Sequence, residues 1–462
     1  MRRLPRGFHP LGQESGGAGV PTPAPPPLSS MYDLDPAHDP APGSRRRWGI
    51  FISGCLGFFL SMFYRVSTAV IAPDLMRDLD LDPARMGALG AVFYYAFALS
   101  QLPLAVALDR IGPRATLTAL GLMGVAGAAL FGLAQDYHQA LLARVLLGLG
   151  MSGALMGVFA LLAAWFPINR FGFISGMLVS LGTAGNLLAA SPLALMARAL
   201  GWRGAFLCIA GVQALVGVAF FLVARDHPPG HMGPPRARNS LGGLLALMTT
   251  FSFWGLAAAN FGRYGFFAAV QGTWAGPFLI QGLGLETVTA GNVIAMMGVG
   301  YMLGLPVCGR LSDRWLKTRK WVAWPGNLLM LALTWSVALW SGEPPLWLAY
   351  ISFLGLGLLC APGQLAMAHI KELTPAGQAA QAMTALNLVT MLGPGLMGQV
   401  LGWSLEITGG SGPGQSFDVI WHLGALGMGL GALLYYFVPD SRALRPEPRT
   451  PAPGPARGAD KE

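Results

Sequence analysis

Between Trp48 and Val438 the chain consists almost entirely of long apolar runs that are separated by short polar connections. A helix needs about 20 mainly apolar residues to cross the hydrocarbon layer of a bilayer. Only 11% of the residues are charged, against about 25% in a typical soluble domain. Because lipid offers no partners to backbone polar groups, each span must satisfy them internally as a helix. The sequence therefore predicts an all-α membrane protein.

The apolar runs predict twelve transmembrane helices and a division of the chain into five parts. We place the helices at roughly 48–72, 86–108, 114–134, 138–166, 170–198, 202–224, 244–276, 287–309, 321–341, 345–370, 377–404 and 418–438. The parts are a tail at 1–47, a six-helix bundle at 48–224, a linker at 225–243, a second six-helix bundle at 244–438 and a tail at 439–462. Both tails are rich in Pro and Arg, so we expect them to be disordered.

Lys and Arg are concentrated on the face of the predicted bundle that holds the two tails, and few occur in the connections on the other face. Such a bias places both termini in the cytoplasm and requires an even number of spans. The formal net charge of +9 lies in loops and tails, so it orients the chain and gives no indication of nucleic-acid binding. We expect a monomer in the inner membrane of a bacterium, with the lipid bilayer as its surroundings.

The sequence gives no sign of a cofactor, a metal site or catalysis. Its four cysteines lie inside apolar runs without C-x-x-C spacing: Cys55, Cys208, Cys308 and Cys360. There is no G-x-x-x-x-G-K-[ST] nucleotide motif. No Ser–His pair, carboxylate pair or metal cluster falls at membrane depth either. We therefore expect no cofactor and no enzymatic activity.

A short polar segment occurs twice, at nearly equivalent places in the two predicted bundles. The copies are A-V-A-L-D-R-I-G-P-R at 105–114 and G-R-L-S-D-R at 309–314. They resemble the loop signature G-x-x-x-D-R-x-G-x-R of the major facilitator superfamily of secondary transporters, although Ala105 and Leu316 stand where glycines should be. Arg144-Val-Leu-Leu-Gly-Leu-Gly150 also resembles the R-x-x-x-G-x-G element of that family.

The resemblance implies two pseudo-symmetric bundles that enclose a binding site and open alternately to either side. It also implies gating residues, which are Asp109, Arg110, Gly112, Arg114, Arg144, Gly309, Asp313 and Arg314. A carboxylate is stabilised where it faces a helix N-terminus. By resemblance, Asp109 should dock near Pro375 at the eleventh helix, and Asp313 near Pro167 at the fifth. The alternative is that these segments are ordinary positive-inside loops and that Arg144 only extends toward the headgroups.

Two arginines lie well inside predicted helices, Arg65 in the first and Arg263 in the seventh. A charge at membrane depth is costly and usually faces a cavity. No Asp or Glu is buried opposite them, so an anionic ligand would neutralise the charge, and a guanidinium group suits carboxylate or phosphate oxygens. The arrangement resembles that of organic phosphate:phosphate antiporters and, more distantly, anion:cation symporters. The alternative is that each arginine bonds backbone carbonyls or neighbouring tyrosines.

Polar residues on the same predicted helices or near mid-membrane complete the candidate substrate site: Tyr64, Tyr94, Tyr95, Asn186, Asn260, Gln271, Gln364 and Asn387. For each of them a helix–helix hydrogen bond is the alternative to a contact with the substrate.

We therefore expect a secondary transporter that moves a small organic anion, a carboxylate or phosphate ester, as an antiporter or symporter. A coupling proton or counter-anion is left open. The first alternative is an exporter of drugs or siderophore-like metabolites, which Asn186 disfavours because drug:proton antiporters carry Pro at that place. The second is a membrane sensor on the same fold that transports nothing.

Overall fold

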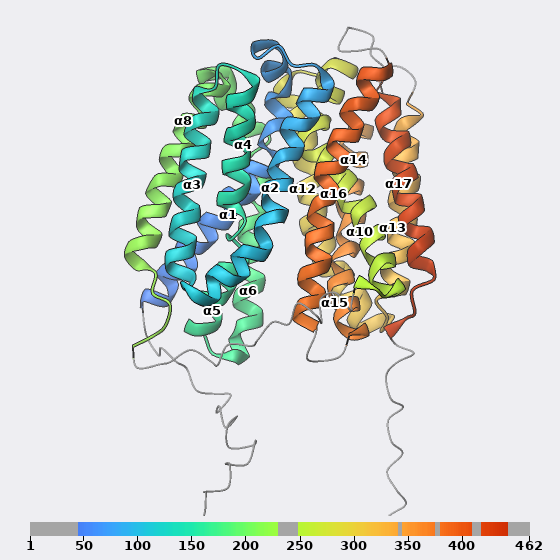
Figure 1. Ribbon diagram of the computed structural model, residues 1–462. Coiled ribbons are helices and arrows are strands. Elements are labelled where there is room, and N and C mark those ends of the chain that lie inside the picture. The colour runs from blue at the N-terminus through green and yellow to red at the C-terminus, as the bar shows by residue number, and fades with distance from the viewer. Residues whose placement is uncertain (1–44, 230–247, 341–343, 375–378, 409–416, 442–462) are drawn as a thin grey trace, which may run out of the picture. The chain divides into compact units, whose positions relative to one another are not determined.

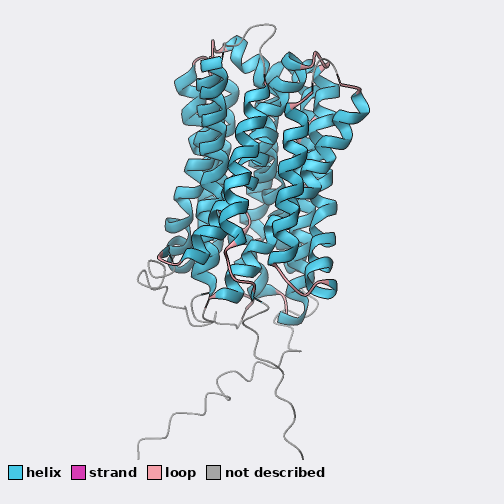
Figure 2. Cartoon of the chain, turned by 90° about the vertical axis from the view of Figure 1, so that its right-hand side faces the viewer, coloured by secondary structure: helices cyan, strands magenta, loops and turns pink. Residues whose placement is uncertain are grey.

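The computed structural model describes residues 45–229, 248–340, 344–374, 379–408 and 417–441. The predicted disorder of the tails falls almost wholly outside these ranges, as does most of the predicted linker. Within them the chain is helical, with short connections and no strand (Figure 2). Helices from the two predicted halves of the chain form separate groups in Figure 1, blue to green for the first and yellow-green to red for the second. The predicted all-α fold is confirmed.

The first bundle contains six rods, some of them broken. Its elements are α1 (Arg45–Asp78), α2 (Pro83–Arg110), α3 (Pro113–Leu133), α4 (Tyr137–Met151), α5 (Met156–Trp165), α6 (Ile168–Thr183), α7 (Gly185–Leu188) and α8 (Ser191–Val223). α4 and α5 together form the fourth rod, and α6 and α7 most of the fifth. α8 is broken at Gly201, where φ is +70°, so its two parts are the end of the fifth rod and the sixth. Only glycine adopts such a φ readily.

The second bundle repeats this plan with more irregular turns. Its elements are α10 (Phe251–Ala269), η1 (Val270–Trp274), α11 (Ala275–Pro277), η2 (Phe278–Gly282), α12 (Thr287–Arg310), η3 (Leu311–Trp315), α13 (Lys320–Ala338), α14 (Leu346–Cys360), η4 (Ala361–Gln364), α15 (Leu365–Leu373), α16 (Ala379–Thr408) and α17 (Asp418–Tyr436). The seventh rod, from α10 to η2, passes Pro277 through π-helical turns. It therefore ends six residues beyond the predicted 276.

Among the described residues, nine rods are long and apolar enough to cross a membrane, or ten when the bent α2 is included. α2 bends by 48° next to Pro103. The seventh rod and α13 complete the twelve spans that the sequence predicts. α1 also departs from its prediction, because it continues through Pro73 to Asp78 instead of ending near 72. In a helical bundle, neighbouring groups and local turns can satisfy the carbonyl that a proline leaves free.

The two bundles touch closely at the end of the molecule that is remote from Arg45 and Tyr436. Gly402 of α16 lies against α2, so that a Cβ there would come within 2.6 Å of the Pro83 carbonyl oxygen. At Gly272 of η1 a Cβ would come within 2.5 Å of the Arg65 carbonyl oxygen in α1. The Thr68 hydroxyl also donates a hydrogen bond of 2.6 Å to the Gly272 carbonyl. Glycine permits this close approach of backbones. We call these contacts the remote seal.

Candidate functional site

A cavity of about 280 Å³ lies between the two bundles, below the remote seal. Helices from both halves line it, including α1, α2, α10, α12 and α16. Most of its wall is apolar, formed by residues such as Phe58, Met62, Phe97, Phe267 and Met391. The structure brings six of the predicted substrate-binding residues to this cavity: Arg65, Tyr94, Asn186, Gln271, Gln364 and Asn387.

Arg65 is the only charged residue among those that line the cavity. Its side chain is 8% exposed, and its guanidinium carbon lies 4.4 Å from the centre of the Phe97 ring. One Nη donates a long hydrogen bond of 3.4 Å to the Tyr264 hydroxyl, and Nε is buried without a partner. A buried charge needs a counter-charge or full hydrogen bonding to be stable. Arg65 therefore has unused capacity to bind an anion in the cavity.

Arg263 lies behind the cavity wall and not in the wall itself. It is 2% exposed and donates a hydrogen bond to the Asn260 side-chain oxygen, so the two predicted residues contact each other. Both line a smaller pocket of about 30 Å³ that shares Tyr264, Gln364, Asn387 and Met391 with the main cavity. The Nε of Arg263 is also buried without a partner. A change at these shared side chains would be needed to bring Arg263 into contact with a ligand at Arg65.

Two tyrosines predicted to bind substrate, Tyr95 and Tyr64, are not among the residues that line the central cavity in this structure, and their binding of substrate stays a prediction. The Tyr95 hydroxyl donates a 3.0 Å hydrogen bond to Gln399 and joins α2 to α16. The Tyr64 hydroxyl donates a 2.6 Å hydrogen bond to Gln213 inside the first bundle. Both make helix–helix hydrogen bonds, which are the alternative to a contact with the substrate.

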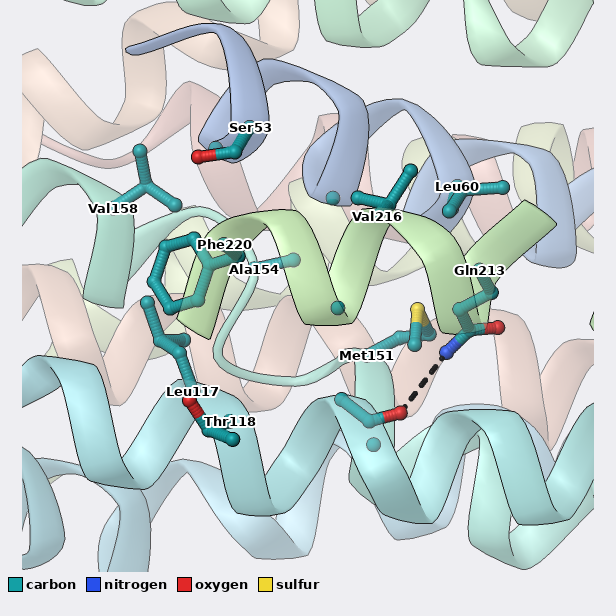
Figure 3. Close-up of a pocket in the computed structure, with 15 residues that line it drawn as sticks. Ser53, Leu60, Leu117, Thr118, Met151, Ala154, Val158, Gln213, Val216 and Phe220 are labelled. Carbon is teal, nitrogen blue, oxygen red and sulfur yellow. Dashed lines mark hydrogen bonds between the residues drawn. The ribbon is translucent and has the colours of Figure 1, made fainter. Parts of the chain in front are cut away.

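Gln213 stands at one end of an apolar pocket of about 70 Å³ within the first bundle, between α1, α3 and α8. Figure 3 shows its amide directed toward α3, where it donates a 3.3 Å hydrogen bond to the Gly121 carbonyl. Val216, Phe220 and Val158 form other parts of the wall. This pocket lies within one bundle and shares no lining residue with the central cavity.

Arg144 is fully buried and connects three helices. Its guanidinium donates to the carbonyl oxygens of Tyr64 in α1, at 3.0 Å, and Leu89 in α2, at 3.3 Å. It also lies 4.7 Å from the centre of the Phe93 ring. The side chain therefore extends inward and not toward the headgroups. In this conformation it holds α1, α2 and α4 together.

The first copy of the repeated loop makes a tight turn that is anchored to the end of the sixth rod. Gly112 has a φ of +98°, which a side chain would strain. The backbone N–H of Arg114 donates a 2.7 Å hydrogen bond to Asp226, and its guanidinium donates to the Phe221 carbonyl. Asp226 thus faces the N-terminus of α3, where a carboxylate is favoured. The sequence reasoning missed Asp226, because nothing in its spacing links it to this loop.

Asp109 and Arg110 are exposed at the same loop. The partner predicted for Asp109 is the start of the eleventh helix near Pro375, which lies outside the described residues. The docking of Asp109 therefore stays a prediction.

In the second copy, Asp313 has a partner within its own bundle. It pairs with Arg319, which also bonds Glu372 at 3.1 Å, whereas docking near Pro167 was expected. Burial alone would lower the pKa of Arg319, but the hydrogen bonds to Asp313 and Glu372 raise it above its ordinary value. Arg319 binds one oxygen of this carboxylate, and the docking of Asp313 near Pro167 stays a prediction.

The other predicted residues of this loop are less constrained. Arg314 is exposed, and a Cβ at Gly309 would meet no neighbour. The missing inner glycine has a visible consequence: the turn occurs at Lys317, whose φ is +52°. A side chain in this left-handed region carries a cost that Gly112 avoids in the first loop.

Comparison with known proteins agrees with the helical fold described above and with the family that the sequence motifs resemble. The family model of the Major Facilitator Superfamily matches residues 54–295 and 256–460. The crystal structure of a bacterial homologue of the human lysosomal transporter Spinster, inward-facing and unoccupied, superimposes with a TM-score of 0.68. The two chains are 18% identical, and the match covers 87% of this chain and 98% of that one. At this identity the likeness shows the fold alone.

The curated relatives differ in how much of their length is matched. The nitrate/nitrite transporter NrtP of Nostoc punctiforme is 28% identical over 47% of this chain and 44% of its own, so the match spans less than half of it. The uncharacterized transporter YybO of Bacillus subtilis is 24% identical over 85% of this chain and 94% of its own. A chloramphenicol resistance protein of Streptomyces lividans is 26% identical over 75% and 86%. Transporters named for sulfoacetate, L-galactonate and tartrate also match.

Proposed function

Because this chain belongs to the Major Facilitator Superfamily of secondary transporters, we propose that it carries a small organic anion across the membrane by alternating access. The observation that carries the proposal is Arg65. It is the one charged side chain among the residues that line the central cavity, and its Nε is buried without a partner. No carboxylate among these lining residues neutralises it. A carboxylate or phosphate oxygen would supply both the counter-charge and the missing hydrogen bond.

Residues from both bundles support an anion at this place. Tyr264 of the second bundle already bonds Arg65 of the first, so a ligand at the guanidinium would contact both halves. Gln271, Gln364 and Asn387 offer amide donors in the same cavity. A ligand held by both halves stabilises the state in which they close around it, and alternating access depends on this coupling. Relatives named for nitrate/nitrite, sulfoacetate, L-galactonate and tartrate are consistent with an anionic cargo.

The orientation of the chain in the membrane and the choice of coupling ion are inferred from the distribution of charged residues. We place both termini in the cytoplasm of a bacterial cell, on the positive-inside distribution of Lys and Arg. The remote seal then closes the outer side. Since no carboxylate lines the described cavity, a proton bound there by the protein is disfavoured as the coupling ion. Exchange for a second anion, or symport with a cation that accompanies the cargo, fits the single positive charge.

The decisive experiment is counterflow in proteoliposomes with a panel of carboxylated and phosphorylated metabolites. Arg65→Gln keeps a polar side chain but removes the charge, so it should abolish saturable anion uptake while the protein remains folded. Arg198→Gln is the matched control, because the side chain of Arg198 is 73% exposed and pairs with the exposed Glu286. Wild-type uptake by Arg65→Gln would refute an anion site at Arg65.

A second candidate function, drug export, is favoured by the chloramphenicol resistance protein among the relatives and by the apolar wall of the cavity. Chloramphenicol is uncharged, so Arg65→Gln should not abolish its transport. The same proteoliposomes can therefore separate the two functions. Saturable uptake of chloramphenicol that is indifferent to Arg65, with no uptake of any anion, would favour the exporter.

A further inference from the structure

A second hollow, of about 490 Å³, lies between α6 of the first bundle and α12 of the second. Its wall includes Gly172, Gly176 and Ser180 of α6 and Met302 and Pro306 of α12. It shares three lining residues with the central cavity, namely Val179, Thr183 and Leu305. These side chains therefore lie between the two spaces. We call the second hollow the lateral portal.

The lateral portal is about as long as one lipid leaflet is thick. Its wall on α6 extends from Gly172 to Thr183, which corresponds to about 16 Å at 1.5 Å per residue. The hydrocarbon core of a bilayer is about 30 Å thick, so this length is roughly half of it. Apolar side chains beside the portal are strongly exposed: Phe173 by 73%, Leu303 by 54% and Val307 by 54%. Such residues are suited to contact lipid chains, so the portal opens beside lipid.

The wall of the portal suits a hydrocarbon chain better than a hydrated ion. None of its described lining residues is charged. The hydroxyl groups of Ser175 and Thr183 donate to carbonyls of their own helix, at Gly172 and Val179. These hydroxyl protons are therefore not free for a ligand. At Gly172 and Gly176 a Cβ would meet no atom within 4 Å, which leaves room between the helices.

The central cavity next to the lateral portal has one charged side chain, that of Arg65. Arg65 lies in the central cavity that the portal adjoins, with Phe58, Met62 and Met391 in the same wall. Arg263 is held by Asn260 behind that wall. A second negative charge on the cargo would find amide and hydroxyl groups in this cavity but no second cation, and a buried charge without a counter-charge is costly. One negative charge on an apolar body matches what the cavity offers.

We infer that the cargo is an amphipathic monoanion, whose charged head binds Arg65 and whose hydrocarbon tail occupies the lateral portal between α6 and α12. It enters from the lipid leaflet on the side of the chain termini. This inference rests on the proposed transport of an anion, and it adds the class of the anion and its route. Small hydrophilic anions would use the site less well, since they leave the apolar wall unfilled.

The test compares two permanently charged anions that share a head group, methanesulfonate and hexanesulfonate, in uptake by wild-type proteoliposomes at equal free concentrations. Each buried methylene strengthens binding by up to about fourfold, so KM should be at least roughly tenfold lower for hexanesulfonate. Gly176→Phe fills the portal without a clash at Cβ and should remove this advantage, so that the KM values of the two sulfonates become equal in that variant. Leu181→Phe is the control, because Leu181 is 51% exposed beside the portal and does not line it.

The outcomes separate the two proposals. Equal KM values for the two sulfonates in the wild-type protein, with uptake that Arg65→Gln abolishes, would overturn the amphipathic cargo and leave anion transport standing. Equal loss of both activities in Gly176→Phe and Leu181→Phe would overturn the portal as a route. If no anion shows Arg65-dependent uptake, the proposed function itself fails. The comparison in the wild-type protein needs no variant, so misfolding of Gly176→Phe would leave the tail-length test intact.

Discussion

Closure of the remote seal depends on the absence of a side chain at Gly402. In Gly402→Ala the new Cβ would lie 2.6 Å from the Pro83 carbonyl oxygen, 3.1 Å from the Trp274 ring and 3.2 Å from the Gly87 Cα. The first and last of these neighbours are backbone atoms, so a side-chain rotation cannot relieve them. Restoring an ordinary contact of 3.4 Å requires α2 and α16 to separate by about 0.8 Å. Such overpacking costs about 1–3 kcal/mol.

This cost applies only to the state in which the seal is closed. The equilibrium should therefore shift toward the state that is open at the remote end, by about 5-fold to 150-fold. The variant Thr273→Cys reports the shift, because Thr273 follows Gly272 of the remote seal in η1 and is 3% exposed. We expect Gly402→Ala to speed its alkylation by an impermeant maleimide added from the outer side.

Gly398→Ala is the matched control in the same interface. Its Cβ would lie 3.7 Å from the nearest atom, Ala269 Cβ, which is an ordinary contact. Alkylation at position 273 should therefore stay at the wild-type rate. Equal rates in the Gly402→Ala and Gly398→Ala proteins would refute the reasoning that close glycine packing sets this equilibrium. A fall in thermal stability with no change in rate would show that the strain acts on the whole fold.

Two further predictions concern stability, measured as thermal unfolding of the purified protein in detergent. Arg144→Gln leaves the buried carbonyls of Tyr64 and Leu89 without their charged donor. It should lower the free energy of unfolding by several kcal/mol, since each unsatisfied buried group costs about 1–3 kcal/mol. An unchanged unfolding temperature would show that Arg144 does not hold its three helices together. Asp226→Ala removes the carboxylate that faces the first turn of α3 and should cost about 1 kcal/mol. Glu286→Gln, at an exposed ion pair, should cost nothing measurable, and a loss as large as that of Asp226→Ala would contradict the proposed capping role.

The class of fold followed from the sequence because the bilayer leaves few alternatives. Runs of apolar residues at membrane length must be helices, and the repeated Asp-Arg loops at 109–110 and 313–314 marked the two halves. Local irregularities were not predictable in the same way. The helix α1 passes through Pro73 and the seventh rod continues past Pro277, since packing against neighbours outweighs the local preference of proline.

The order of apolar and charged residues is enough to show which side chains carry charge at membrane depth, and it identifies Arg65, Arg144 and Arg263 as candidates. Their separate roles become clear only from how the helices pack. Arg65 lines the cavity, Arg144 bonds carbonyls of two other helices, and Arg263 is held by Asn260 behind the wall. Spacing along a helix defines a face of that helix, but it does not say which neighbour covers the face.

Sequence spacing also could not reveal the partners of the two Asp-Arg loops, because these partners lie outside the two repeated segments. Asp226 caps a helix more than a hundred residues earlier in the chain, and Arg319 binds the carboxylate of Asp313. The lateral portal likewise exists only where α6 and α12 approach each other from different bundles. Runs of apolar residues show where a helix can cross the membrane, because apolarity is a property of each segment alone. Contacts between segments depend on the rotation and distance of each helix, and these are set by packing in three dimensions.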